Sequence, residues 1–273
     1  MQRFPTSPKE IIVSFWRNRD LVMALTKREV VGRYRGSMVG IMWSFVTPIL
    51  MLLIYTFVFS VVFKARWEAG SAESKIDFAM ILFVGMIVHG LFAECINRAP
   101  SLILSNANYV KKVIFPLEIL PCVALGSALF HTVISLAVLL LAQLILNQQL
   151  MWTALLFPCV LLPLMFATLG FAWFLAGLGV YVRDIGQLTG MVTTVLLFLS
   201  PVFYPISALP EQYQRLLQLN PLTFIIEQGR NTLIFGRVPD IGEWGMMLAA
   251  GLLIAWAGLV WFQKIRKGFA DVL

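Results

Sequence analysis

The feature that most constrains the fold of this chain is a series of six long apolar stretches separated by short polar connections. Most of them approach the ~20 residues that a helix needs to cross ~30 Å of hydrocarbon. They run over Val39–Phe63, Phe78–Asn97, Ile119–Leu146, Trp152–Val182, Leu188–Phe203 and Trp244–Phe262. The pattern therefore predicts an all-α integral membrane protein with six transmembrane helices.

The basic residues are divided unevenly between the two sides that six spans define. Fifteen of the 21 lysines and arginines fall on the side that holds both termini. The other side keeps Lys64, Arg66, Lys75, Arg215, Arg230 and Arg237, which acidic residues match or outnumber. Because positive residues are retained on the cytoplasmic side, both termini are predicted to be cytoplasmic.

Composition leaves room for one membrane domain and no soluble domain of useful size. The 273 residues are 59% hydrophobic, and the mean hydropathy is +0.84. We expect residues 39–273 to form the membrane domain and residues 1–38 to precede it. The net charge of +7 is explained by the cytoplasmic bias and by anionic membrane lipids, so no nucleic-acid partner is predicted.

Motifs for self-contained catalysis are missing from the sequence. It has no phosphate-binding loop, no GxSxG, no HExxH and no cysteine pair at metal spacing. Cys95, Cys122 and Cys159 lie in or beside apolar stretches, where cysteine behaves as a small hydrophobe. We expect no catalytic residue, metal site, disulfide or cofactor in this chain. The first apolar stretch also starts too late for a signal peptide.

The segment before the first stretch predicts an amphipathic helix. Its apolar residues recur at spacings near three and four with basic residues between them, which is typical of a helix lying in the membrane interface. These apolar residues are Ile11, Ile12, Phe15, Trp16, Leu21, Val22, Leu25 and Val30. The alternative is a helix whose apolar face packs on another part of the protein.

Two connections have more apolar residues than a solvated loop requires. Asn106–Pro121 carries aromatic and apolar residues and two lysines before Pro116, which predicts a short cytoplasmic helix that docks on a partner, followed by a break.

The outer segment 206–237 is too apolar for a loop and too rich in proline for a span. We expect a pair of short re-entrant helices there, with Glu227 and Arg230 paired on one helical face.

Ionisable residues within the apolar stretches invite two interpretations. His89, Glu94 and His131 are candidates for a proton relay, because such residues are costly in a membrane. Alternatively, Glu94 lies near the cytoplasmic interface and pairs with Arg98 one helical turn later. We favour the pair, and we expect His131 to be a satisfied contact between helices.

Aromatic residues crowd the first stretch and the outer half of the fifth. Sugar rings rest their apolar faces on aromatic planes, so these side chains are candidates for lining a glycan path. The candidates are Trp43, Tyr55, Phe59, Phe198 and Tyr204. The alternative is that they face lipid or form the aromatic belts at the interfaces.

Several segments together resemble one family. They are RYRGSMVGIMWSFVTP (Arg33–Pro48), NYVKKVIFPLEILP (Asn108–Pro121), YVRDIGQ (Tyr181–Gln187), SPVFYP and NPLTFIIEQGR. In order and spacing they resemble the membrane subunit of polysaccharide ATP-binding cassette exporters, above all the O-antigen permeases of Wzm type, with capsule and teichoic-acid exporters close behind. The resemblance covers nearly the full chain.

This resemblance implies a type-2 ABC exporter fold in the bacterial inner membrane, with two copies of the chain and two copies of a separate ATPase that uses ATP and Mg. The substrate would be an undecaprenyl-diphosphate-linked polysaccharide moved to the periplasm. A coupling helix near 101–112 would dock on the ATPase through Asn108, Tyr109, Val110, Lys111 and Lys112. Arg33 and Arg35 would contact the lipid diphosphate, although plain cytoplasmic anchoring explains them equally well.

The glycan path is expected between two copies, along the first and fifth stretches. Gly36, Ser37, Gly40 and Ser44 would let helices approach closely there. One alternative function is a capsule, teichoic-acid, drug or lipid exporter of the same superfamily. A second is a proton-coupled transporter, which the lack of an internal repeat disfavours. A third is a polyprenyl-phosphate transferase, for which the sequence has too few acidic clusters.

Overall fold

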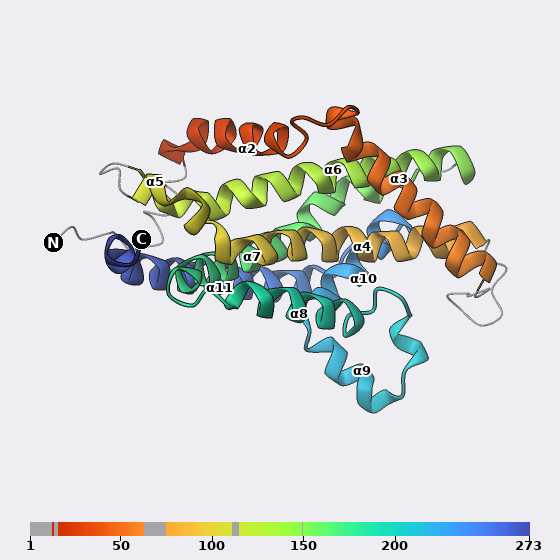
Figure 1. Ribbon diagram of the computed structural model, residues 1–273. Helices are drawn as coiled ribbons and strands as arrows, with labels where there is room; N and C mark the ends of the chain where they lie inside the picture. The colour runs from red at the N-terminus through yellow and green to blue at the C-terminus, as the bar shows by residue number, and fades with distance from the viewer. Residues whose placement is uncertain (1–12, 14–15, 63–74, 111–114, 149) are drawn as a thin grey trace.

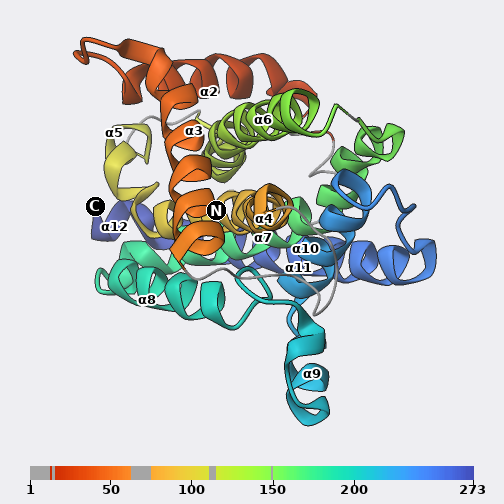
Figure 2. The ribbon, with the colours of Figure 1, turned by 90° about the vertical axis from the view of Figure 1, so that its right-hand side faces the viewer.

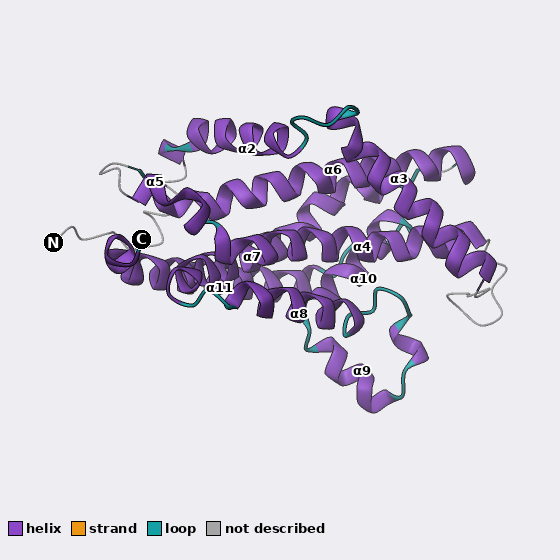
Figure 3. Ribbon diagram, in the orientation of Figure 1, coloured by secondary structure: helices purple, strands orange, loops and turns teal. Residues whose placement is uncertain are grey.

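The computed structural model describes residue 13 and residues 16–62, 75–110, 115–148 and 150–273. Throughout these ranges the regular structure is helical, and no strand occurs in them (Figure 3). Of the predicted features, residues 1–12, 14–15, the end of the first stretch at Phe63, and Lys111 and Lys112 lie outside the described residues. The predicted all-α class is confirmed.

Among the described residues, five helical segments are long and apolar enough to cross a membrane. They are Gly40–Phe59, Phe78–Ser101, Leu117–Leu146, Trp152–Tyr181 and Ile241–Val272. Their main helices are α3 (Trp43–Tyr55), α4 (Lys75–Arg98), α6 (Leu120–Leu146), α7 (Phe157–Tyr181) and α11 (Ile241–Ile265). In Figure 1 the last four follow the long axis of the bundle, and α3 crosses it obliquely. The chain is a multi-pass membrane protein.

Shorter elements join and cap these helices. They are α2 (Arg19–Arg33), η1 (Gly40–Met42), η2 (Thr56–Val62), η3 (Ala99–Ser101), η4 (Leu104–Asn106), α5 (Ala107–Val110), η5 (Leu117–Ile119), η6 (Trp152–Leu156), α8 (Ile185–Phe198), η7 (Ile206–Ala208), α9 (Glu211–Gln218), α10 (Pro221–Leu233), η8 (Arg266–Gly268) and α12 (Phe269–Val272). In Figure 1, α5 and α12 lie at one end of the bundle and α9 lies toward the other.

The fifth predicted stretch is a shorter helix than expected. The sequence predicted a span over Leu188–Phe203, whereas α8 has 14 residues and ends at Phe198. At 1.5 Å per residue it is ~21 Å long, less than the hydrocarbon thickness. Pro201 and Pro205 follow it, and a proline neither donates to the helical ladder nor favours a helical residue before it.

Helix α4 occupies the centre of the bundle (Figure 2). Of its most apolar segment, 72% is buried inside the chain, against 11% for the span that contains α3. Val84 and Leu91 on α4 belong to one apolar cluster with Phe157 and Leu161 of α7 and Ile226 of α10. The core is therefore built around α4, and α3 leaves most of its apolar surface open.

Helices α7 and α11 pack at backbone contact through glycines. A Cβ at Gly258 would collide with the backbone of Gly170, and one at Gly251 would lie 2.6 Å from the carbonyl oxygen of Pro163. In a membrane, where apolar burial drives association little, such close approach supplies much of the attraction between helices.

The outer segment includes two short helices, α9 and α10; their re-entry into the membrane stays a prediction. Helix α9 extends away from the bundle (Figures 1 and 2), whereas α10 turns back and packs on α4 and α7. The return starts at Asn220, whose side chain accepts a hydrogen bond from the backbone N–H of Leu222 and caps α10.

Helix α2 packs on another part of the chain, which was the alternative to a purely interfacial helix. Val22 and Leu25 pack against Ile119 of η5 and Val123 near the start of α6. Met23 on the same helix is exposed. Lipid contact by the exposed side of α2 remains a prediction.

Candidate functional site

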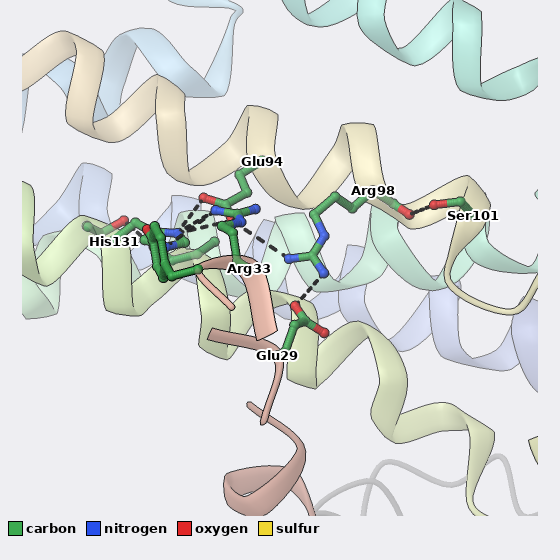
Figure 4. A network of polar contacts seen from close by, with 9 residues as sticks. Glu29, Arg33, Glu94, Arg98, Ser101 and His131 are labelled. Atoms are coloured by element: carbon green, nitrogen blue, oxygen red, sulfur yellow. Dashed lines mark hydrogen bonds and ion pairs between the residues drawn. The ribbon is translucent and has the colours of Figure 1, made fainter. Parts of the chain in front are cut away.

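A cluster of charged side chains joins α2, α4 and α6 around Glu94 (Figure 4). The Glu94 carboxylate lies 2.8 Å from Arg33 Nη2 of α2 and 3.1 Å from His131 Nδ1 of α6. The predicted partner, Arg98, is also present, at 3.8 Å. A shorter contact links Arg98 to Glu29 on α2. Two carboxylates thus face two guanidinium groups, so the cluster is balanced in charge.

His131 is satisfied on both sides of its ring. Nδ1 lies 3.1 Å from Glu94 Oε2 and 3.0 Å from Arg33 Nη1, and Nε2 lies 3.0 Å from the Tyr34 hydroxyl. Partial burial raises the pKa of Tyr34, although the neighbouring Arg33 guanidinium opposes that rise. The expectation that His131 is a helix contact is confirmed, but its partner, 37 residues away, was missed.

The predicted coupling helix is three short segments in the structure: η3, η4 and α5. The Tyr109 ring stacks on Phe115 with centroids 4.2 Å apart, and Arg28 of α2 donates to its hydroxyl at 3.0 Å. Tyr109 and Val110 are half-buried against the chain's own core, whereas Asn108 is exposed. This segment is therefore mechanically connected to α2.

A second arginine supports the same segment from the C-terminal end of the chain. Arg266 Nη1 lies 2.7 Å from Glu118 Oε2, and its Nη2 donates to the Phe115 carbonyl at 2.8 Å. The indole N–H of Trp173 on α7 donates to the Glu118 carbonyl at 2.8 Å. Sequence reasoning missed this contact, because its two ionic partners are 148 residues apart.

Arg230 fastens the outer helix α10 to the bundle. Its side chain is fully buried, and it donates to the carbonyls of Ile81 at 3.1 Å and Val202 at 3.0 Å. The predicted pair with Glu227 is present at 2.8 Å. Burial lowers the pKa of Arg230 to about 10, and Glu227 opposes the shift, so the guanidinium stays charged at neutral pH.

Four of the five candidate path aromatics lie near one another. Phe59 stacks on Phe203 with centroids 5.9 Å apart, and Phe203 lies 5.7 Å from Phe198. Tyr55 lies 6.5 Å from Phe59, and the Tyr204 hydroxyl donates to the Phe198 carbonyl at 2.8 Å. Trp43 stands at the opposite end of α3 and is exposed.

Polar contacts also hold the short helix α8 to the central helix. His89 Nε2 lies 2.9 Å from the carbonyl of Thr193, and the Thr193 hydroxyl donates to Asn97 at 3.1 Å. His89 is therefore a contact between α4 and α8.

Known proteins resemble the chain over nearly its whole length. Residues 20–234 match the family described as ABC-2 type transporter. The O-antigen export system permease protein RfbA of Myxococcus xanthus is 28% identical over 96% of this chain and 98% of its own length. RfbA of Klebsiella pneumoniae is 23% identical over 93% and 95%. The polysialic acid transport protein KpsM of Escherichia coli is 23% identical over 80% and 83%.

Proposed function

The chain belongs to the ABC-2 type transporter family, and from that premise we propose that it is the membrane subunit of an ATP-driven polysaccharide exporter. The observation that carries this proposal is the end-to-end similarity to O-antigen export permeases. It agrees with a chain built almost wholly of membrane helices.

The substrate we propose is a polysaccharide linked to undecaprenyl diphosphate, moved from the cytoplasm to the periplasm across the bacterial inner membrane. Both chain ends would then be cytoplasmic, as the distribution of basic residues predicts. Arg35 is exposed, and the Arg33 side chain stays 40% exposed while it pairs with Glu94. Both are therefore available to the lipid diphosphate, which guanidinium groups bind well.

In this proposal the energy comes from a separate ATPase, present in two copies. That ATPase would bind ATP with Mg and hydrolyse the ATP, which this chain would not do. The ATPase would contact the α5 segment at Asn108, and Lys111 and Lys112 after it. The structure supports a mechanical role for this segment, because Arg28 ties it to α2 and Arg266 braces the residues after it.

The glycan path is proposed to lie between two copies of the chain. Helix α3 exposes Trp43, Phe45 and Leu53, and η2 after it exposes Phe57, so together they offer an apolar face to a second copy. The Tyr55 and Phe59 cluster with Phe198 and Tyr204 would border this path near its outer end. Helix α8 and the turn after it would serve as the short fifth crossing, and α9 and α10 as the re-entrant exit.

Measuring ATP hydrolysis by the purified chain, with and without its ATPase, tests which of the two proteins hydrolyses ATP. We expect no hydrolysis by the chain alone. In the reconstituted complex, Tyr109→Asp with Val110→Asp should abolish transport or release the ATPase, because charge enters a half-buried apolar contact. Val238→Asp, on the exposed connection before α11, is the control and should behave like the wild type. Hydrolysis by the chain alone, or normal transport by the double variant, contradicts the proposal.

A further inference from the structure

A groove of about 500 Å³ runs between α7, α8 and α11, and Phe92 and Ile96 of α4 and the start of α10 also line it. This volume is in the range of ligand sites. Its walls are apolar except for Thr189 and Asn220 among the described residues. Both polar side chains are already bonded: Thr189 donates to the Gly186 carbonyl, and Asn220 donates to Ser200. The groove therefore offers a ligand apolar surface only.

The groove is long, because its walls follow two helices. On α8 the lining residues recur every three or four positions from Ile185 to Leu196, which corresponds to ~16 Å along the axis. The facing wall on α7 extends over a similar length, from Pro163 to Leu175. Both α7 and α11 are membrane-spanning segments, so the groove lies at a depth where hydrocarbon, not water, is the solvent.

One end of the groove is basic. Ile185 lines it as the first residue of α8, and Arg183, two residues earlier, is exposed. Within the described part of the chain Arg183 has no ion pair or side-chain hydrogen bond, and Asp184 beside it is also exposed. Tyr181 donates to the carbonyl of Ile265 at 3.0 Å, which brings the end of α11, with exposed Lys264, to the same end.

We propose that this groove binds one acyl chain of an anionic membrane phospholipid, whose phosphate lies against Arg183 and Lys264. An apolar channel of this shape fits a single extended hydrocarbon chain, and a basic group at one end fits the charge of the headgroup. His89 and Asn97 hold α8 to α4 on its other side. The bound chain would thus fill the space between α8 and α7 and support a helix that is otherwise attached on one face.

The test uses the full chain in nanodiscs that contain phosphatidylglycerol with a photoactivatable group near the acyl terminus. After illumination, label is expected on the groove walls of α7, α8 and α11. Ala250→Trp should lower that labelling about tenfold, because displacing about two buried methylene groups costs about that factor in affinity. Ala250 lines the groove and is exposed, so the larger side chain is tolerated without a clash in the core.

The neighbouring residue provides the matched control. Ala249 is exposed on the same helix but does not line the groove, so Ala249→Trp should label like the wild type. Arg183→Gln should remove the preference for phosphatidylglycerol over phosphatidylcholine, and Arg183→Lys should keep it. Equal labelling in both tryptophan variants overturns the proposal, as does labelling without headgroup preference. Competition by a polyprenyl phosphate but not by phospholipid would assign the groove to a different lipid and also overturn it.

Discussion

At the scale of single residues, Glu94 is the carboxylate that joins α2, α4 and α6 in one polar cluster. Its carboxylate contacts Arg33, Arg98 and His131 at once. Hydropathy and helical spacing predicted only the contact with Arg98, four residues away. The other two partners come from distant parts of the chain, and nothing in a local pattern indicates which helices will meet. The sequence therefore identified the residue but not its network.

Glu94→Gln should destabilise the protein, because two arginines lose their shared carboxylate. The site is only partly exposed, so we expect a loss between the values for surface and buried pairs, about 1–3 kcal/mol. Thermal unfolding in detergent measures it. A double-mutant cycle with Arg33→Gln should show coupling, whereas Glu211→Gln, on an exposed carboxylate of α9, should leave stability unchanged. Additive effects of the two cluster variants would contradict the network.

Arg230→Met should be more damaging than any exposed arginine variant. The change leaves the Ile81 and Val202 carbonyls without their donor, and each unsatisfied buried group costs about 1–3 kcal/mol. Glu227 also loses its partner. We expect α10 to detach and limited proteolysis to cut near it. Arg215→Met on α9 is the control, and equal protease resistance of both variants would refute this role.

At the scale of elements, sequence patterns predicted which segments are helical better than where those helices end. Five of the six apolar stretches are span-length helices, because a long apolar segment in lipid must satisfy its backbone internally. The predicted length of the fifth stretch was wrong. The apolar residues continue past Phe198, but the helix ends there because Pro201 follows. The coupling segment likewise breaks into short turns that hydrophobic spacing did not indicate.

The contact between α7 and α11 gives a sharp test at this scale. Gly258→Ala places a Cβ against the backbone of Gly170, so the helices must separate, and overpacking of this kind costs about 1–3 kcal/mol. Thermal unfolding in detergent should show the loss. Gly245→Ala on the same helix meets nothing within 4 Å and should be neutral. Equal melting temperatures for the two variants would mean that the contact is not tight.

At the scale of the whole molecule, the open apolar face of α3 is the surface on which we propose that a second copy of the chain packs. Cysteines placed singly along α3 and η2, after replacement of Cys95, Cys122 and Cys159, should form disulfides between copies at exposed positions such as Leu53 and Phe57. Ser44, which is buried, should not react. If no exposed position crosslinks and none reacts with water-soluble thiol reagents, α3 lies away from both the interface and the path.

The most direct measurement of the central claim is the side of the membrane on which glycan accumulates when the gene for this chain is deleted in its own bacterium. The account predicts that one surface polysaccharide disappears while its lipid-linked form accumulates on the cytoplasmic side. The wild-type gene should restore the surface polymer, and the variant with Tyr109→Asp and Val110→Asp should not. Unchanged surface polysaccharides with no intracellular accumulation would contradict a role in polysaccharide export.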